Sequence, residues 1–419
     1  MNFILSIPME ARLAAVFVLG LCLGGAVNWA IYRLAWHPRP ISPWSRPDPS
    51  APRRRPWDRL PIVGWLGLRR ESSLHGTCFW VRPMLLELLL GIGLAWLYWW
   101  EVGATGLLPE GGSRFLTLDI QEILHFQFAS HTTLIALMLA ASMIDADEKI
   151  IPDEITIPGT LVGLLFAAAC PISLLPGGLV LSSGQIGVVF LHFASPNSWQ
   201  DWLEGGPQAG SLAAGLACWW MWCAALMPRT WYRRHGWLRA MQLAWARLLR
   251  EPSTYRILRM ALMGTVAIAL VWYRGGLGWQ ALLSAIVGMA VGCGLVWAVR
   301  IVGTAALQQE AMGFGDVTLM AMIGAFLGWQ SCLVIFFLAP LPCLVVGVSR
   351  LILFRDKENP YGPFLCMAAL FLIVFWDSVW GYTQNYFALG WILALVMLCC
   401  LLLMGGMLGA WRLIRSAFR

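Results

Sequence analysis

The chain has 419 residues, of which 59% are hydrophobic and 12% are charged. Soluble globular domains carry about 25% charged residues, so this composition excludes a soluble enzyme and indicates a polytopic membrane protein. The formal net charge of +7 at pH 7 comes almost wholly from arginines in short loops between apolar segments. That distribution favours membrane topology over nucleic-acid binding as its cause.

Apolar segments of about 17–25 residues recur along the chain and predict an all-α fold, a bundle of about eleven membrane-spanning helices. The expected spans are 11–34, 83–101, 126–144, 156–176, 209–227, 259–274, 279–301, 317–330, 332–354, 363–382 and 388–411. They divide the chain into an N-terminal part (1–101), a core (126–382) with an insertion at about 177–278, and an extra span with a basic tail (388–419).

Arginine placement predicts the orientation of this bundle. Loops 35–82 and 228–258 are rich in arginine, whereas loop 177–208 between them contains no lysine or arginine. Positively charged loops stay in the cytoplasm. We therefore expect a multi-pass protein of the inner (cytoplasmic) membrane, surrounded by lipid, with its N-terminus outside and its C-terminus in the cytoplasm.

Two segments between the spans differ from the rest. Residues 36–82 are rich in proline and arginine and show little periodicity, which predicts irregular structure. Residues 231–250 place tryptophan, leucine and methionine on one helical face and arginine elsewhere. This pattern predicts either an amphipathic helix on the inner leaflet or a cytoplasmic hairpin packed on the bundle, and both interpretations stay open.

Two aspartates lie where apolar spans meet short polar loops, and both are expected at the cytoplasmic face. Asp145 ends the third span, and Asp316 follows two glycines in Gly313-Phe-Gly315-Asp316. A carboxylate close to hydrocarbon is costly and tends to mark a functional site. Each also has a structural explanation on its own, Asp145 as an ordinary interfacial carboxylate and Asp316 as a helix N-cap.

Together the two aspartates predict hydrolytic chemistry. Two carboxyl groups a few Å apart share one proton, because like charges raise the pKa of one member. The ionised member takes a proton from water while the neutral member donates to the scissile carbonyl. The pair therefore predicts a membrane aspartic protease.

Several strings of this sequence match a known family in order. The segment from Ile144 through Asp145 to Pro152 and the string Gly313-Phe-Gly315-Asp316 resemble the two motifs of the type IV prepilin leader peptidases, the bacterial GxGD aspartic proteases. Pro360-Tyr-Gly362-Pro-Phe364 resembles the family string Pro-Phe-Gly-Pro-Phe. Near the N-terminus, the string that contains Asn28, Tyr32 and Arg33 resembles a further family motif.

The resemblance implies an integral membrane endopeptidase that removes the basic leader of prepilins or pseudopilins, the substrates of type IV pilus and type II secretion systems. It implies that Asp145 and Asp316 are the catalytic pair. Residues expected to shape the site are Asp147, Pro152, Glu310, Gly313 and Gly315. Asp147, Glu148 and Glu310 are also expected to attract the basic leader. No cofactor is expected for proteolysis.

The chain departs from the family pattern in three places. The two Cys-x-x-Cys pairs of the family's cytoplasmic loop are absent, since Cys78 is the one cysteine there, which argues against a zinc site. Methylation of the product with S-adenosylmethionine, an activity of some members, stays open. Thr318 replaces a lysine, and about 100 extra residues precede the glycine motif.

Two alternative functions remain. A non-proteolytic transporter would use boundary carboxylates as a proton relay, and it predicts charged residues near mid-membrane. A catalytically idle scaffold of a secretion system would fit the large insertion and the missing cysteines. The sequence itself does not identify the substrate, the role of the insertion or the oligomeric state.

Overall fold

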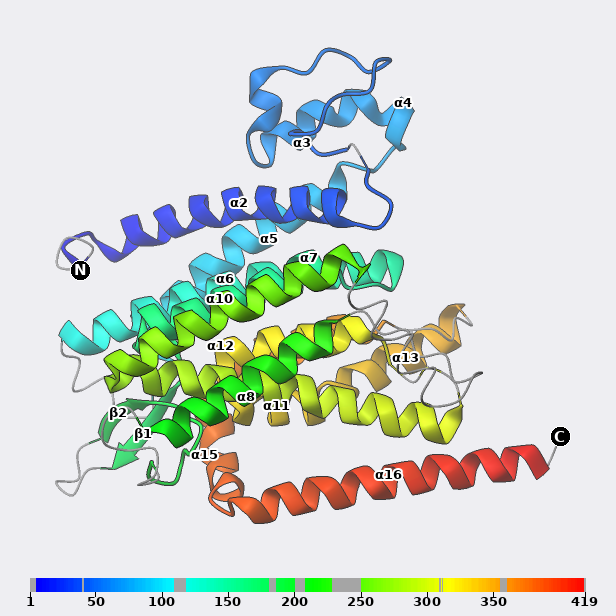
Figure 1. Ribbon diagram of the computed structural model, residues 1–419. Helices are drawn as coiled ribbons and strands as arrows, with labels where there is room; N and C mark the ends of the chain where they lie inside the picture. The colour runs from blue at the N-terminus through cyan, green and yellow to red at the C-terminus, as the bar shows by residue number, and fades with distance from the viewer. Residues whose placement is uncertain are drawn as a thin grey trace.

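The computed structural model describes residues 5–39, 41–108, 118–180, 186–199, 208–227, 250–308, 310, 312–354 and 360–417. Long helices run side by side through the molecule and make up one bundle (Figure 1). This arrangement confirms the all-α class. The expected amphipathic stretch 231–250 lies almost wholly outside the described residues.

Helices α2 (Met9–Leu34) and α5 (Val81–Tyr98) pack closely at one side of the bundle. Their backbones approach at glycines, because a Cβ added to Gly24 would lie 2.6 Å from the Cα of Glu87. Small residues allow this kind of approach between membrane helices. Glu87 is 2% exposed, and its Oε1 accepts a hydrogen bond from the side chain of Asn28 at 3.2 Å. Asn28 thus holds the α2–α5 pair together.

The centre of the bundle is formed by α6 (Leu118–Glu148), α7 (Asp153–Ala169), α11 (Gly276–Leu307) and α12 (Phe314–Leu338). Helices α11 and α12 meet at a pair of glycines, since a Cβ on Gly288 would lie 2.2 Å from the carbonyl oxygen of Gly324. Nearly all of the first half of α12 is buried. The core therefore surrounds the helix that begins at the Gly-x-Gly-Asp string.

Helix α12 is not a straight rod. Gly328 interrupts it with a φ of 83° and a ψ of 170°, a conformation that glycine adopts readily. The Cys332 Sγ lies 3.9 Å from the Met320 carbonyl oxygen. In a straight helix these twelve residues would span about 18 Å. The chain therefore reverses at Gly328, which lies within the expected span 317–330 and two residues before its expected end.

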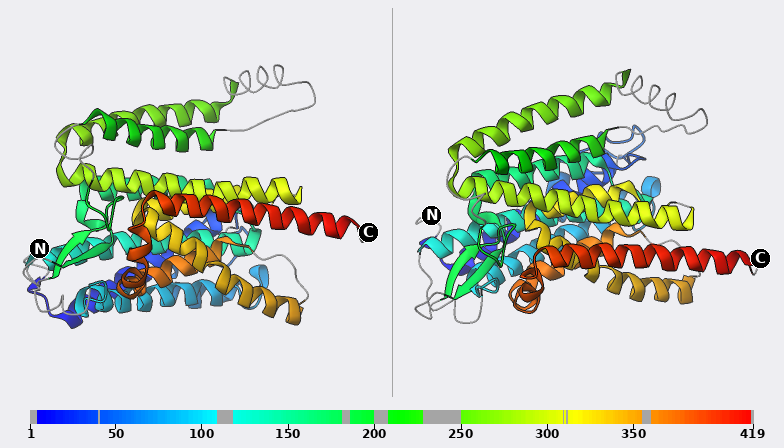
Figure 2. Two further views of the ribbon diagram at one scale, coloured as in Figure 1. Left: turned by 90° about the horizontal axis from the view of Figure 1, so that it is seen from below. Right: turned by 60° about the horizontal axis from the view of Figure 1, so that its bottom comes forward.

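The remaining helices complete the bundle: α8 (Ala209–Leu226), α10 (Pro252–Arg274), α13 (Pro340–Phe354), α14 (Gly362–Val374), α15 (Trp376–Phe387) and α16 (Trp391–Ala417). Helices α8 and α10 form a pair at one edge (Figure 2). Among the described residues, 8 helical stretches are long and apolar enough to cross a membrane, or 9 with the bent pair α14–α15. The chain is therefore a multi-pass membrane protein, and the total of eleven spans stays a prediction.

A small antiparallel hairpin belongs to the expected insertion. Strand β1 (Pro176–Val180) pairs with β2 (Ile186–Phe190), with Pro176 opposite Phe190. It lies at the end of the bundle opposite the C-terminus (Figure 1). Indole groups attach this region to the core, because Trp329 Nε1 donates to the Phe193 carbonyl at 2.7 Å and Trp376 Nε1 donates to the Pro176 carbonyl at 2.7 Å.

The arginine-rich segment at the other end folds into short helices, so the prediction of irregular structure for 36–82 is wrong in part. It contains a 3-10 turn at Pro56–Arg59, α3 (Val63–Leu68), a 3-10 turn at Arg69–Glu71 and α4 (Ser72–His75). Trp65 and Leu68 are 1% and 0% exposed. Trp65 Nε1 donates to Glu87 Oε1 at 2.7 Å, which attaches the segment to α5. We call this end of the bundle the basic end.

Candidate active site

A cavity of about 890 Å³ lies at the basic end, where α6, α7, α12 and α14 meet. Its lining residues are Asp145, Lys149, Ile150, Ile151, Asp153, Glu310, Met312, Gly313, Phe314, Gly315, Asp316, Pro360 and Tyr361. Asp145 and Asp316 are far apart in the sequence, yet both line this cavity, at 5% and 7% exposure. The two carboxyl groups are close enough for their charges to interact.

Asp145 lies near the C-terminal end of α6, with the first residue of α14 directly beside it. The Gly362 N–H donates to Asp145 Oδ2 at 3.1 Å. A Cβ on residue 362 would lie 2.6 Å from that oxygen and 2.8 Å from Ile151 Cδ1, so the contact requires glycine. The N-terminus of a helix stabilises a nearby anion. The Pro360–Phe364 string therefore supplies the amide that orients Asp145.

Asp316 lies in the first turn of α12 and beside Gly313, since a Cβ added to Gly313 would lie 3.6 Å from Asp316 Oδ2. Gly313 and Gly315, which precede Asp316, have different structural roles. Gly313 is the N-cap of α12 in an extended conformation, with a φ of −67° and a ψ of 154°, which does not require glycine. A Cβ on Gly315 would lie 2.7 Å from Ile151 Cβ, so this glycine lets α12 begin directly against the turn that follows Asp145.

The turn between α6 and α7 places the Ile151 side chain against Gly315 of α12 and Gly362 of α14. Lys149 has a φ of 58°, a left-handed conformation that reverses the chain after α6. Pro152 is the N-cap of α7, and its carbonyl accepts the Ile155 N–H at 3.1 Å. Pro152 does not line the cavity. It contributes by ending the turn and starting α7.

The three acidic residues expected to attract a basic ligand each have a partner. Asp147 pairs with Arg82 at 2.7 Å and does not line the cavity. Glu148 accepts the backbone N–H of Trp36 at 2.6 Å. These two contacts tie the end of α6 to both ends of the arginine-rich segment. The third, Glu310, lines the cavity and pairs with Arg300 at 2.7 Å.

Among the cavity residues that were not predicted as site residues, three have polar or charged side chains: Lys149, Asp153 and Tyr361. Asp153 directly follows Pro152, and its carboxylate contacts the Thr318 hydroxyl. Thr318 also accepts a hydrogen bond from Thr156 at 3.0 Å. Thr318, which replaces the lysine of the family pattern, therefore connects α12 to α7. In the sequence, the position of Asp153 directly after Pro152 could have identified it as a candidate site residue.

Residues Asn28, Tyr32 and Arg33 of the N-terminal motif lie away from this cavity. Asn28 and Tyr32 are buried where α2 meets α5 and the arginine-rich segment, with the Tyr32 ring centroid 6.4 Å from that of Trp65. Arg33 is exposed. These residues support the packing of the basic end and do not contact the two aspartates.

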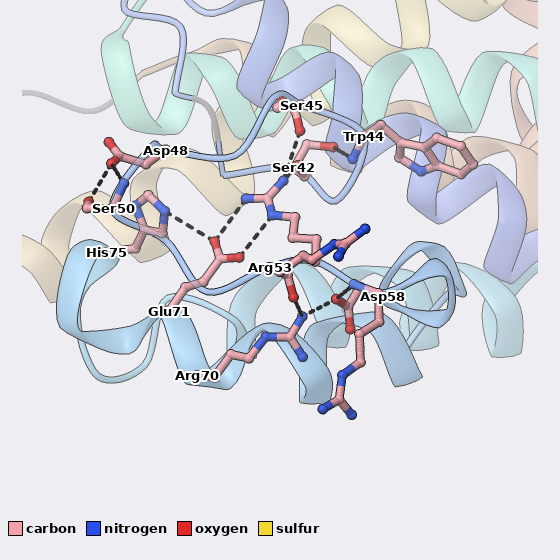
Figure 3. Close-up of polar contacts among 12 residues, drawn as sticks. Ser42, Trp44, Ser45, Asp48, Ser50, Arg53, Asp58, Arg70, Glu71 and His75 are labelled. Atoms are coloured by element: carbon pink, nitrogen blue, oxygen red, sulfur yellow. Dashed lines mark hydrogen bonds and ion pairs between the residues drawn. The ribbon is translucent and has the colours of Figure 1, made fainter.

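The arginine-rich segment has a polar core of guanidinium and carboxylate groups. Glu71 is 0% exposed and receives two hydrogen bonds from Arg54, each at 2.9 Å. His75 lies 3.6 Å from the same carboxylate, and Arg70 pairs with Asp58 (Figure 3). Arg54 also donates to the carbonyl of Ser42 at 2.8 Å. These contacts join the start of the segment to its last helix.

This donor set does not fit a structural zinc ion. Such a site needs four ligands, usually thiolates and imidazoles. Cys78 is exposed, and the carboxylates of Asp58 and Glu71 are already bound to arginines. Among the described residues, no group of three or more His, Cys, Asp or Glu side chains could hold a metal.

We expect the substitution Glu71→Gln to destabilise the arginine-rich segment. Removing one partner of a buried ion pair costs about 3–5 kcal/mol, because the remaining charge is left uncompensated. Thermal unfolding and limited proteolysis of the purified protein measure the effect. Glu10→Gln, at an exposed position on α2, is the control and should behave as the wild type. A metal chelator should leave the wild-type transition unchanged, and a chelator-induced loss of stability would contradict this account.

Comparisons with known proteins agree with these motifs. The model of the type IV leader peptidase family matches residues 132–227 and 253–348. The model of the bacterial peptidase A24 N-terminal domain matches residues 18–101. The first match is interrupted at 228–252, within the expected insertion. No solved structure matches the chain.

Three curated relatives illustrate the similarity, and each is named a prepilin leader peptidase/N-methyltransferase. The protein from Aeromonas salmonicida is 29% identical over 155 residues, which are 34% of this chain and 52% of the relative. The Pseudomonas putida protein is 22% identical over 401 residues, 89% of this chain and 93% of the relative. The Myxococcus xanthus protein is 27% identical over 214 residues, 50% of this chain and 57% of the relative. The chain thus spans about half the length of the first of these relatives.

Proposed function

Because this chain belongs to the type IV leader peptidase family, we propose that it is an integral membrane aspartic endopeptidase. Its substrates are the leader-bearing precursors of type IV pilins or of pseudopilins of type II secretion systems. One observation carries the proposal: Asp145 and Asp316 are both buried in one cavity, where their charges interact.

The proposed reaction needs one proton shared by the two aspartates. Two charged carboxylates in a buried cavity repel each other, so one member is protonated. The ionised carboxylate takes a proton from a water molecule as the water oxygen attacks the carbonyl carbon of the scissile peptide. The carboxylic acid gives its proton to the carbonyl oxygen. Collapse of this intermediate breaks the C–N bond and re-forms the C=O bond: the carboxyl group that holds the water proton gives it to the leaving amine, and the other carboxylate takes back the proton of one hydroxyl group.

The position of the cavity supports a substrate that approaches along the membrane surface. It lies at the basic end, beside the ends of α6, α12 and α14, where a precursor helix in the membrane and its polar leader would meet. We place this end in the cytoplasm and the protein in the inner membrane, following the arginine distribution. The lining carries the further carboxylates of Asp153 and of Glu310, which is paired with Arg300, and a carboxylate such as Asp153 suits a basic leader.

The proposed proteolysis uses only side chains of this chain and water, without a metal or other cofactor. Methylation of the new N-terminus is a separate reaction that requires S-adenosylmethionine. Mass spectrometry of the cleaved product, formed with and without added S-adenosylmethionine, decides whether this chain carries it out.

The test of the proposal is a cleavage assay with the full chain in membranes. The substrate carries a basic leader, a glycine and an apolar helix, and cleavage should follow the glycine. A matched substrate in which the leader arginines and lysines are replaced by glutamine should be cleaved more slowly. Proton flux in liposomes without any cleavage would instead support the transporter alternative.

A further inference from the structure

The side chains that line the cavity include many hydrogen-bond acceptors and few hydrogen-bond donors. Among the described residues that line it, only Lys149 and Tyr361 carry a side-chain N–H or O–H apart from the carboxyl groups. Lys149 already takes part in an interaction of its own. A peptide carbonyl that becomes a tetrahedral centre gains negative charge on its oxygen and requires a hydrogen-bond donor there. Beside the protonated member of the aspartate pair, Tyr361 is a second side-chain donor that this cavity offers.

The backbone of Tyr361 is held firmly beside the two aspartates. Its carbonyl accepts hydrogen bonds from Phe364 N at 3.0 Å and Leu365 N at 3.3 Å, in the first turn of α14. The next residue is Gly362, whose N–H holds Asp145. The Tyr361 ring packs partly buried against the hydrophobic core. The same short turn therefore orients Asp145 and places the phenol at the cavity.

The phenol remains protonated under working conditions. Burial raises the pKa of Tyr361 well above its ordinary value of 10.0, and the charges of Cys343 and Asp316 act in the same direction. A neutral phenol can donate a hydrogen bond. Unlike a lysine, it adds no positive charge that would change how the two aspartates share their proton.

We propose that Tyr361 is a third catalytic residue, whose hydroxyl donates a hydrogen bond to the carbonyl oxygen of the scissile peptide as that oxygen gains negative charge. This inference rests on the proposed peptidase function. The phenol gives up no proton: the proton on the carbonyl oxygen comes from the carboxylic acid, and water supplies the attacking oxygen. The role of Tyr361 is to stabilise the tetrahedral centre between attack and cleavage.

Tyr361 stands where this chain departs from the family string Pro-Phe-Gly-Pro-Phe. The family string has phenylalanine where Tyr361 stands, and it has lysine where Thr318 stands. The Thr318 hydroxyl is engaged with the Gly315 carbonyl at 3.0 Å and does not line the cavity.

The substitution Tyr361→Phe tests the hydroxyl alone, because the ring and its packing remain. We expect kcat for leader cleavage to fall about 100-fold, the typical effect of losing one such donor, with KM and the melting temperature unchanged. Tyr382→Phe removes the same atom at a position in α15 that is 81% exposed, and it should leave kcat unchanged. An uncleavable peptide with a tetrahedral hydroxyl-bearing centre should bind the Tyr361→Phe variant about 10-fold more weakly.

Two outcomes separate this inference from the proposed function. If Tyr361→Phe keeps the wild-type kcat and binds the tetrahedral peptide normally while Asp145→Asn is inactive, the phenol has no catalytic role and the peptidase assignment stands. If the Asp145→Asn and Asp316→Asn variants cleave as well as the wild type, the proposed function itself is wrong, and the role of Tyr361 falls with it.

Discussion

Replacing Asp145 or Asp316 with asparagine is expected to reduce leader cleavage by at least about 10²- to 10⁴-fold, the usual contribution of a positioned acid or base. Asparagine has nearly the same shape as aspartate and can still accept the Gly362 N–H, but it neither takes a proton from water nor gives one to a carbonyl. The rate of leader removal in membranes with a fixed amount of each variant measures the loss.

The two single variants and the double variant should lose activity to a similar extent, since the carboxyl groups act as one unit. Asp48→Asn changes an exposed aspartate of the arginine-rich segment and should retain full activity. Melting temperatures of all variants report whether the fold is preserved. A correctly folded Asp316→Asn protein with wild-type cleavage would show that the buried pair does not carry the reaction.

The substitution Gly315→Ala is expected to have the second largest effect. The added methyl group would lie 2.7 Å from Ile151 Cβ and 3.3 Å from the Ile151 backbone N and O. Backbone atoms cannot move aside as a flexible side chain would, so the first turn of α12 must shift and carry Asp316 away from Asp145. A misplacement of this kind, of about 1 Å, costs roughly 10²-fold in rate.

The matched control is Gly294→Ala on α11, where an added Cβ would meet nothing within 4 Å. This variant should cleave the leader at the wild-type rate. Both proteins should be purified in detergent, compared by thermal unfolding and then assayed with the same precursor. Equal cleavage by the Gly315→Ala and Gly294→Ala proteins would exclude a tight contact between α12 and the 149–152 turn as a requirement for activity.

Features of the site that depend on local sequence could be predicted. Asp145 and Asp316 were expected at the same face of the membrane, because hydropathy and arginine placement report span ends residue by residue. The glycines of the Gly-x-Gly-Asp string were expected to permit a close backbone approach. The structure identifies the partner of that approach as Ile151, which the sequence analysis did not consider.

Other features required the folded chain. Asp147 was expected to shape the site, yet it pairs with Arg82 on α5. The irregular structure expected for residues 36–82 is replaced in part by short helices around Glu71 and Arg54. Ion pairs between residues far apart in sequence leave no periodic pattern. A search for hydrophobic periodicity therefore misses a segment that a polar core stabilises.

The amino-acid sequence by itself determined that this protein is a helical membrane protein and that two aspartates lie at one face of it. Those properties follow from the local free energy of transferring each segment into lipid. Only the tertiary structure decided that Gly362 orients Asp145, that α12 reverses at Gly328 and that Tyr361 reaches the cavity. These are contacts between separate helices, and they depend on how glycines let backbones approach, which no single segment specifies.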